Sequence, residues 1–588
     1  METRGIVCDY NHGTNQLTMW TSTQIPHLVR LLLALTLGHP EHLIRVIAPD
    51  VGGGFGSKLY MYAEEVITAV VAKRVRRPVK WIESRQEAYL ATTHGRDHLS
   101  TARIAGSRDG RIDAIDVDTT ANLGAYLSTF APLVPTLLYG LMMSGPYDLA
   151  NVRCKVTGVY TNTTPVDAYR GAGRPEATYL VERIVDIFAA EIGMDPAEIR
   201  RKNFIEPFDD ARPVATGVAY DSGDYEPAFD RALEMAGYGE FRKEQEAART
   251  EGRYLGIGLS TYVEICGGAP SHVAVTLGAR AGLWESATVR VNPTGTVRVF
   301  TGASTHGQGH ETTFAQLVSA ELGVAMENVE IVHGDTDQVQ FGTGTFGSRS
   351  AAVGGGAIHM SLTKIKEKAK KLAAHLLEAA PEDIEYEDGK LFVRGAPGEA
   401  KTFGDIALAA HVYAGELPEG IEPGLEETSF FDPSNFTWPF GTHIAIVEVD
   451  GDTGEVTPLR YIAVDDVGNV INPMIVDGMV HGGAAQGLGQ ALQEEAVYDD
   501  EGQLLTGSMM DYAVPSAEDL PSFEVDRTVT PTSVNPMGVK GAGETATIAG
   551  SPAVINAVVD ALSHMGVRHL DMPAKPERVW RLVREARS

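Results

Sequence analysis

Glycine-rich loops, each followed by a helix-like segment, are the part of this sequence best suited to chemistry. Their sequences are GGGFGSK (52–58), RGAGRPE (170–176), THGQGH (305–310), GTGTFGSRS (342–350), HGGAAQGLGQAL (481–492) and VKGAGE (539–544). The start of a helix offers free backbone N–H groups, which bind anions and especially phosphates. One such loop is more often a simple turn, but a series of them favours a large ligand that carries phosphate groups.

Familiar nucleotide-binding and catalytic motifs do not occur in these loops. None combines GxGxxG spacing with the expected acidic ribose contact, and GxxxxGK[ST], HExxH and GxSxG are absent from the sequence. His94 and His98 are four residues apart, but no third metal ligand accompanies them. We therefore expect no metal ion held by side chains, and any metal should be carried by a cofactor.

Composition excludes several classes of partner. The chain has 588 residues, with 49 Lys and Arg against 78 Asp and Glu, so its formal net charge is −29. This excess of negative charge argues against binding to nucleic acid or to an anionic membrane surface. Apolar residues make up 43% and charged residues 22%, which is ordinary for a folded protein, and the length requires several domains.

The cysteines and the N-terminal residues indicate which metal sites and which cellular compartment to expect. Cys8, Cys154 and Cys266 form no CxxC pair, which argues against a cysteine zinc site, an iron–sulfur cluster within this chain and a disulfide framework. The N-terminal residues lack the apolar core of a signal peptide, and the apolar run 28–37 is short and contains Arg30. We expect no membrane span and a cytoplasmic location.

The order of predicted elements indicates an α+β fold with an internal repeat. Strand, polar turn with glutamine, helix, strand and Gly-Phe-Gly loop occur in this order in 15–58 and again in 294–349. The repeat predicts two large pseudo-repeated α/β domains that hold one ligand between them. We place these domains at 1–240 and 241–588, with a linker in the charged stretch 240–253, where no apolar period is evident.

Seven motifs together resemble a known family. In chain order they are STQIPH, APDVGGGFGSK, TTPVDAYRGAGRPE, THGQGHET, GTFGSRS, VDDVGNVINPMIV and GVKGAGE. They resemble the molybdenum-binding large subunit of the xanthine dehydrogenase, aldehyde oxidase and aerobic carbon-monoxide dehydrogenase family, the molybdenum hydroxylases. The resemblance implies an oxidoreductase whose two molybdopterin-binding domains hold the cofactor at their interface. The first domain would form the metal and substrate side, and the second the clamp for pterin and nucleotide.

The resemblance also implies the cofactor and the residues that serve it. The cofactor is molybdopterin cytosine dinucleotide, whose phosphates suit the glycine loops. Glu544 matches a glutamate that acts as general base, Gln24 a glutamine that hydrogen-bonds an oxo group of the metal, and Arg170 an arginine at the substrate and metal site. The implied cofactor-binding residues are Gly54, Phe55, Gly56, Gly171, Gln308, Gly309, His310, Gly347, Ser348, Arg349, Lys540 and Gly541.

Other interpretations of these residues stay open at this point. Lys540 is four residues before Glu544 and is expected to tune it. From residue types alone, Glu544 could instead cap a helix and Gln24 could end a strand. Arg170 could form a surface ion pair, and Phe55 could pack in an ordinary core.

Departures from the family narrow the expected substrate. Its carbon-monoxide dehydrogenases carry a cysteine after the loop arginine, where this chain has Gly171. Its xanthine dehydrogenases carry a glutamate and an arginine for the purine, where this chain has Leu59 and, by spacing, Leu138. We therefore expect neither carbon monoxide nor xanthine as substrate. An apolar pocket fits an aldehyde or an N-heteroaromatic ring, and N-methylated purines stay open.

Electron transfer requires partners, because this chain has no ligands for an iron–sulfur cluster. The resemblance implies a [2Fe–2S] small subunit and an FAD-binding medium subunit in a dimer of heterotrimers. Family members begin with a hammerhead domain, and we expect it to be a separate polypeptide here or lost from a truncated product. A non-catalytic molybdopterin-binding paralogue is the alternative, and an NAD-binding oxidoreductase is disfavoured by the loop spacings. The presence of both Gln24 and Glu544 favours the enzyme.

Overall fold

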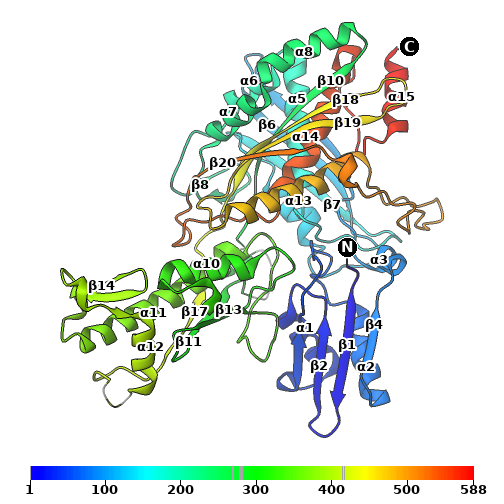
Figure 1. The fold of residues 1–588 in the computed structure, drawn as a ribbon. Helices are drawn as coiled ribbons and strands as arrows, with labels where there is room; N and C mark the ends of the chain where they lie inside the picture. The colour runs from blue at the N-terminus through cyan, green and yellow to red at the C-terminus, as the bar shows by residue number, and fades with distance from the viewer. Residues whose placement is uncertain (1, 268–269, 277–281, 414, 416, 588) are drawn as a thin grey trace.

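The computed structural model describes residues 2–267, 270–276, 282–413, 415 and 417–587. Within these residues the chain forms several β-sheets whose faces are covered by helices (Figure 1). The prediction of an α+β fold is confirmed. Two four-stranded sheets form separate arms below a central body in Figure 1, one near the N-terminus and one in the middle of the chain.

The first sheet shows how the sequence sets a one-sided core. Its strands are β1 (Gly5–Asn11), β2 (Gln16–Thr21), β3 (Ile44–Ile47) and β4 (Val79–Ile82), in the order β3-β2-β1-β4. Alternate apolar side chains, including Cys8 on β1 and Met19 on β2, are buried in one cluster with residues of two helices. These helices are α1 (Pro26–Leu37) and α2 (Ala63–Val75). The loop 48–62 between β3 and α2 carries the Gly-Phe-Gly motif.

The second sheet has the same topology. Its strands are β11 (Glu285–Val291), β12 (Val297–Thr301), β13 (Val329–Val332) and β17 (Leu425–Phe431), in the order β13-β12-β11-β17. In both sheets the second strand pairs antiparallel with the first and parallel with the third, and a helix connects the parallel pair. That helix is α1 in the first sheet and α10 (His310–Leu322) in the second. The predicted internal repeat is therefore present in the structure.

The central body holds the third four-stranded sheet. Its strands are β10 (Tyr254–Val263), β18 (Phe440–Val449), β19 (Val456–Asp466) and β20 (Phe523–Thr528). Helix α14 (Thr545–Leu562) lies on this sheet, and α13 (Pro473–Leu492) lies on α14 (Figure 1). Glycine permits the close approach, because a Cβ at Gly258 would lie 2.1 Å from the carbonyl oxygen of Ala553 on α14.

Helix α14 is mostly apolar and is buried along nearly its whole length. The segment Thr545–Met565 is long and apolar enough to cross a membrane, but 94% of its most apolar window is buried inside the protein. This burial is what a core helix of a folded domain shows. By length and composition it is the one such candidate among the described residues.

The third layer of the body is built on β5 (His98–Gly106), β6 (Ile112–Asn122) and β7 (Asn151–Val159), with α5 (Arg174–Ile192) packed against it. The remaining helices and strands are α3 (Arg85–Ala91), α4 (Tyr139–Leu141), α6 (Pro196–Asn203), β8 (Arg212–Pro213), β9 (Ala219–Tyr220), α7 (Tyr225–Ala236), α8 (Tyr238–Thr250), α9 (Ser271–Thr276), α11 (Gly355–Leu376), β14 (Ile384–Glu387), β15 (Lys390–Val393), β16 (Lys401–Thr402), α12 (Phe403–Val412) and α15 (Pro576–Arg587).

The interpretation of 240–253 as a linker is wrong. Most of this stretch lies in α8, which buries Phe241, Gln245 and Ala248. These three positions are spaced for one helix face, but only two of them are apolar, so the period is weak in the sequence. The division into 1–240 and 241–588 stays a prediction, and one core cluster contains residues from both parts.

Candidate active site

Glu544 is the residue on which loops from distant parts of the chain converge. It is the N-cap of α14. Its Oε1 accepts hydrogen bonds from the backbone N–H of Gly171 at 2.7 Å and from Arg174 Nη2 at 2.8 Å. Its Oε2 accepts a hydrogen bond from Ser348 Oγ at 2.9 Å. The glycine loops at 170–176 and 342–350 therefore both position this carboxylate.

These donors fix the charge of Glu544. Burial by itself raises the pKa of this carboxyl, but the charge of Arg174 and the hydrogen bonds from Gly171 and Ser348 outweigh it and lower the pKa below the ordinary glutamate value. Glu544 is thus ionised at neutral pH. As a capping residue it makes no side-chain hydrogen bond to its own helix, so its carboxylate is turned toward the loops.

Gln24 joins the loops of the two repeats. Its Nε2 donates to the carbonyl oxygen of Thr345 at 2.8 Å, and its Oε1 accepts from the backbone N–H of Gly56 at 3.0 Å. A Cβ on Gly54 would lie 2.6 Å from the Gln24 side chain, so this position requires glycine. The side chain is 3% exposed, and it forms an internal bridge instead of ending a strand at the surface.

Phe55 is presented outward by the same loop. Its backbone has a left-handed φ of 54°, and its side chain is 42% exposed, so it is not an ordinary core residue. Its carbonyl oxygen accepts from the backbone N–H of Arg170 at 2.9 Å, and its ring centroid lies 5.8 Å from the guanidinium carbon of Arg170. Two predicted site residues are thereby brought together.

Arg170 is an internal clamp and not a surface ion pair. Its Nε donates to the carbonyl oxygen of Gly543 at 2.7 Å, and its two terminal nitrogens donate to Gln486 Oε1 at 3.0 Å and to the carbonyl oxygen of Met479 at 3.1 Å. The side chain is buried, and this burial lowers its pKa. Arg170 therefore ties helix α13 to the residue directly before Glu544.

The loop before α10 provides no side-chain cap for the helix. Helix α10 begins at His310 after Gly309, which has a left-handed φ of 79°, and no side chain caps it. Gln308 turns into its own loop, where its Oε1 accepts from the backbone N–H of His306 at 2.6 Å. Burial, together with the charges of Lys58 and Arg170, lowers the pKa of His306 to about 4. His306 is therefore neutral at neutral pH, and Glu311 in the first turn of α10 is an anion, because its pKa is lowered by hydrogen bonds and by His333.

Three predicted cofactor-binding residues have other surroundings. Arg349 is fully buried and donates to Glu285 Oε2 at 2.7 Å, so its guanidinium anchors the loop. His310 stacks on Phe314 with ring centroids 5.1 Å apart, and burial lowers its pKa to about 3. The ammonium group of Lys540 donates to two backbone carbonyls and lies 3.7 Å from Asp221.

Lys540 therefore does not serve Glu544 as expected. The arginines Arg174 and Arg170 are the cations that act on Glu544. The expectation treated residues four apart as neighbours, but α14 starts only at Thr545, so the intervening residues do not follow a helix. Next to Lys540, Gly541 packs tightly: a Cβ there would lie 2.3 Å from the carbonyl oxygen of Ser348.

Two residues of the site were not predicted. Arg174 belongs to the loop 170–176 and was given no role from the sequence, yet it makes the ion pair with Glu544. Glu264 follows β10 and contacts Arg174 Nη1 at 3.3 Å through its Oε1. The available signal was a single carboxylate in the otherwise uncharged run GIGLSTYVEIC, because a charged residue in a buried strand needs a partner.

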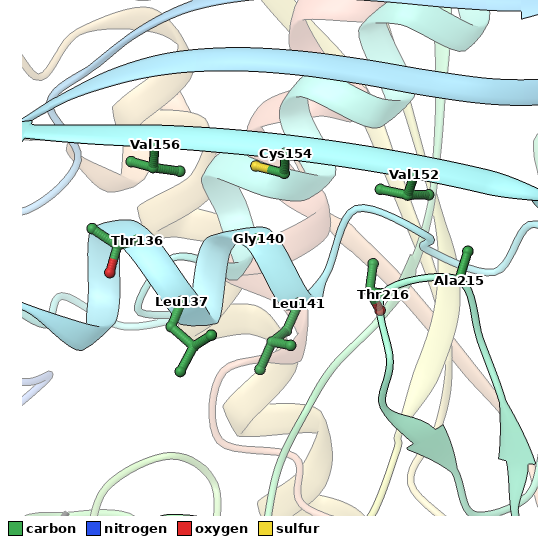
Figure 2. Close-up of a pocket in the computed structure, with 9 residues that line it drawn as sticks. All are labelled: Thr136, Leu137, Gly140, Leu141, Val152, Cys154, Val156, Ala215 and Thr216. Carbon is green, nitrogen blue, oxygen red and sulfur yellow. The ribbon is translucent and has the colours of Figure 1, made fainter. Parts of the chain in front are cut away.

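A separate pocket of about 420 Å³ lies on the body, between α4 with the turn before it and strand β7 (Figure 2). Its lining is mixed and includes Leu137, Leu141 and Val152 together with Thr136 and Thr216. None of the predicted site residues lines it.

Comparison with known proteins identifies the family. Models of the molybdopterin cofactor-binding domain match residues 1–204 and 231–521. The chain is 40% identical to the carbon monoxide dehydrogenase large chain of Hydrogenophaga pseudoflava, over 100% of this chain and 73% of that protein. It is 37% identical to the nicotine 6-hydroxylase large subunit of Paenarthrobacter nicotinovorans, over 99% and 71%. The crystal structure of quinoline 2-oxidoreductase from Pseudomonas putida 86 superimposes with a TM-score of 0.96 at 40% identity, over 100% of this chain and 74% of that one.

The chain belongs to the molybdopterin-binding large subunits of the carbon monoxide dehydrogenase and xanthine dehydrogenase family. It is thus a molybdopterin-dependent oxidoreductase subunit, as the motifs predicted.

The described residues fit the family's cofactor. The uncapped start of α10 offers backbone N–H groups to an anion, and a Cβ at Gly307 or Gly347 would meet no atom within 4 Å, so both loops border open space. The buried hydroxyls of Ser304 and Thr343 lack a hydrogen-bond partner among the residues described, which leaves two donors in these loops. Residues of 54–56, 305–310 and 347–348 would hold the cofactor.

The cofactor and the protein side chains would have different roles in the reaction. When bound, the cofactor supplies the redox chemistry at a substrate carbon. The protein supplies an ionised carboxylate, Glu544, held by three donors and able to accept a proton. Gln24 and Arg170 fix the loops around it from both repeats, which preorganises the site.

Proposed function

We propose that this chain is the catalytic large subunit of a molybdenum hydroxylase that oxidises an aldehyde or an N-heteroaromatic carbon, with the added oxygen taken from water. The observation that carries the proposal is the carboxylate of Glu544, held by three hydrogen-bond donors from two glycine loops and positioned to accept a proton. Its pKa is lowered by Arg174, so the group is ionised at neutral pH. A subunit that only carried the cofactor would not require a partly buried ionised carboxylate at this place. Gln24 is also in place, joining the two loops that border the site.

Carbon monoxide is a poor candidate substrate. Gly171 stands where the family's carbon-monoxide dehydrogenases have a cysteine, and it has a φ of 105°. A Cβ there would lie 2.3 Å from Pro175 and 3.1 Å from Arg96, so a larger side chain is excluded without a shift of the loop. A sulfur ligand at this position is therefore incompatible with the loop as folded.

The relatives' names support an N-heterocycle. Two similar proteins are named for nicotine and quinoline, both of which are N-heteroaromatic compounds. Leu59, which replaces the purine-binding glutamate, is buried in the core of the first repeat, so no acidic group is available there for xanthine. Ring substrates with few N–H groups suit this site best.

We further propose the cytosine dinucleotide form of the cofactor and partner subunits that carry FAD and a [2Fe–2S] cluster, in a dimer of heterotrimers. The described residues contain no group of three or more His, Cys, Asp or Glu side chains that could hold a metal ion, so electrons need another route out. Three free cysteines agree with a reducing cytoplasm.

Metal and nucleotide analysis tests the proposal. The protein is expressed with its partner subunits, and molybdenum and CMP released by acid are measured per chain. We expect about one of each, together with turnover of quinoline-like or nicotine-like rings or of aldehydes. Folded protein that contains molybdenum and CMP but oxidises none of these would favour the non-catalytic paralogue, and turnover of carbon monoxide would contradict the substrate assignment.

A further inference from the structure

A third arginine lies beside the loop that holds Glu544. Arg96 belongs to the segment between α3 and β5, which is joined to residues 165–167 by backbone hydrogen bonds. Glycine permits this close approach, because a Cβ at Gly95 would lie 2.6 Å from the Cβ of Tyr169. The guanidinium carbon of Arg96 lies 4.3 Å from the centroid of the Tyr169 ring. The side chain of Arg96 is therefore directed at the residues that lead into the loop.

Arg96 is an unfavourable residue for its position. Its backbone has a left-handed φ of 57°, which residues other than glycine rarely adopt. Its side chain is only 8% exposed, and its Nε and Nη1 have no hydrogen-bond partner in the part of the chain that the structure describes. Both features lower the stability of the folded state. A role at the neighbouring site explains this arginine better than a contribution to folding does.

The remaining terminal nitrogen of Arg96 contacts the site loop. Its Nη2 donates a hydrogen bond to the carbonyl oxygen of Arg170. That carbonyl and the backbone N–H of Gly171 belong to one peptide group, and this N–H donates to Glu544 Oε1 at 2.7 Å. In a trans peptide the C=O and the N–H point in opposite directions. The peptide group between 170 and 171 therefore has the guanidinium on one side and the carboxylate on the other.

The loop does not fix the orientation of this peptide group by its own conformation. Three consecutive residues have positive φ: 105° at Gly171, 46° at Ala172 and 86° at Gly173. Glycine adopts either sign of φ at similar cost, so the peptide before Gly171 can turn over with little steric hindrance. Turned over, it would direct the carbonyl oxygen of Arg170 at the Glu544 carboxylate, and the two would repel each other. A group outside the loop is needed to hold the observed orientation.

Taking Glu544 as the base of the proposed function, we propose that Arg96 fixes the orientation of the 170–171 peptide group and so keeps the N–H of Gly171 directed at Glu544. A cation at the carbonyl end also polarises the peptide, which strengthens the donor at the N–H end. Arg96 is in this sense a positioning residue, because it acts on Glu544 through one peptide group.

The groups around Arg96 leave its hydrogen bond to the loop in place. Glu176 on α5 has its Oε2 3.9 Å from Nε of Arg96, which is too far for a hydrogen bond. Burial raises the pKa of Glu494, and the charge of Arg96 acts against that rise. Burial raises the pKa of Tyr169 to about 12, so its side chain is neutral. The guanidinium is thus attracted by its surroundings, while its hydrogen bond is made to Arg170.

The pKa of Glu544 reports on this arrangement. The hydrogen bond from Gly171 is one of the interactions that lower that pKa. The charged and titratable groups that face Glu544 are Arg174, Arg170 and Glu264. They are all retained when Arg96 is replaced, so a raised pKa of Glu544 in an Arg96 variant indicates that the Gly171 hydrogen bond has been lost.

Two variants of Arg96 separate the donor from the packing. Arg96→Met has a similar length but cannot donate, whereas Arg96→Lys keeps a cation that can donate to one carbonyl. Crystal structures of the full-length chain with its partner subunits show the peptide directly. We expect the 170–171 peptide to be turned over, or present in two orientations, in Arg96→Met and to keep its orientation in Arg96→Lys. An unchanged peptide in Arg96→Met would overturn the proposal. These structures need no turnover, so they decide the matter even if the hydroxylase activity is not found.

The pH profile of the molybdenum-loaded enzyme gives an independent readout. Arg96→Met should lower kcat by about tenfold and move its acid limb up by roughly one pH unit, because Glu544 loses a donor to its ionised form. Arg96→Lys should stay near the wild type. Arg76→Met is the matched control, since Arg76 also has a left-handed φ, of 56°, but lies at the exposed end of α2.

A purely structural role gives a different result. In that case Arg96→Met would lower the melting temperature but leave the acid limb at the wild-type pH, which contradicts the proposal. If Arg96→Met does not fold, Arg96→Lys decides. A folded Arg96→Lys enzyme that keeps the donor and yet loses its activity, or has its acid limb moved up, contradicts the proposal, and wild-type behaviour supports it.

Discussion

The two repeats carry loops of nearly the same sequence that serve different purposes. The first reads Phe-Gly-Ser-Lys at 55–58 and the second Phe-Gly-Ser-Arg at 346–349. In both loops the glycine after the phenylalanine has a positive φ, 103° at Gly56 and 57° at Gly347. In the first loop Phe55 also has a positive φ, at 54°, and its side chain is 42% exposed. In the second, Ser348 has positive φ, at 55°, and its hydroxyl reaches Glu544. The second left-handed residue precedes the shared glycine in the first loop and follows it in the second, which changes the side chain that each loop presents.

What the two loops share is their anchor. The cation that ends each loop is buried, and it pairs with a glutamate at or just before the first strand of its own sheet: Lys58 with Glu2, and Arg349 with Glu285. The comparison indicates that duplication kept the anchor and altered the exposed part. The loop of the first repeat offers an aromatic wall, and that of the second supports the base.

The largest effect on turnover should follow from replacing Glu544, the carboxylate that the loop of the second repeat holds through Ser348. Glu544→Gln keeps the shape but cannot accept a proton, so kcat should fall by about 10²–10⁴-fold. Molybdenum content and melting temperature should stay near the wild type, and Glu65→Gln serves as a remote control. Turnover equal to that of the wild type would show that Glu544 is not the base.

Equivalent glycines should differ in what they tolerate. Gly56 and Gly347 occupy the same place in the two loops, but a Cβ at Gly56 would lie 2.2 Å from the carbonyl oxygen of Ala168, whereas one at Gly347 meets nothing within 4 Å. We expect Gly56→Ala to lower the free energy of unfolding by about 3 kcal/mol. Gly347→Ala should cost about 1 kcal/mol, from its positive φ alone. Chemical denaturation measures both, and equal losses would remove the distinction.

Equivalent serines should differ in their effect on pH dependence. Ser57 Oγ donates within its own loop to Gly54, whereas Ser348 Oγ donates to Glu544. The pKa of Glu544 is lowered, so wild-type activity should fall only below the ordinary glutamate pKa of about 4.3. Ser348→Ala removes a donor to the ionised form, which raises that pKa and moves the acid limb up by roughly one pH unit. Ser57→Ala should leave the limb in place, and a shift in both variants would refute the contrast.

The smallest effect should come from the ion pair that joins the repeats. Arg45 on β3 forms two hydrogen bonds to Asp335 of the second repeat. Because Arg45 is partly exposed, Arg45→Ala should cost about 1 kcal/mol or less. Arg298→Ala, which breaks a pair with Glu330 inside the second sheet, is the control. A much larger loss of unfolding free energy in Arg45→Ala would mean that the two repeats depend on this contact to stay together.

The sequence was sufficient for what repeats or follows a spacing rule. The repeated order of elements in the two sheets could be predicted from the sequence, and the resemblance to the family implied that the loops 170–176 and 342–350 share one site with Glu544. The orientation of Arg349 and Lys540 could not be predicted. A cation next to a glycine loop can face either the site or a buried carboxylate, and the sequence does not distinguish the two. Residue Glu264 was missed because its partners lie on α5 and α14, which are distant in the chain.

Helix α14 carries Glu544 at its first turn and is buried along its length, with glycines of β10 against its backbone. Its amides should therefore exchange with deuterium only when the whole body unfolds, whereas those of the exposed glycine loops should exchange through local opening. Glu544 is thus attached to the element that is expected to unfold last. If a warmed sample is inactive while the amides of α14 are still protected from exchange, only the loops around the Glu544 carboxylate have opened. Cooling should then restore the activity.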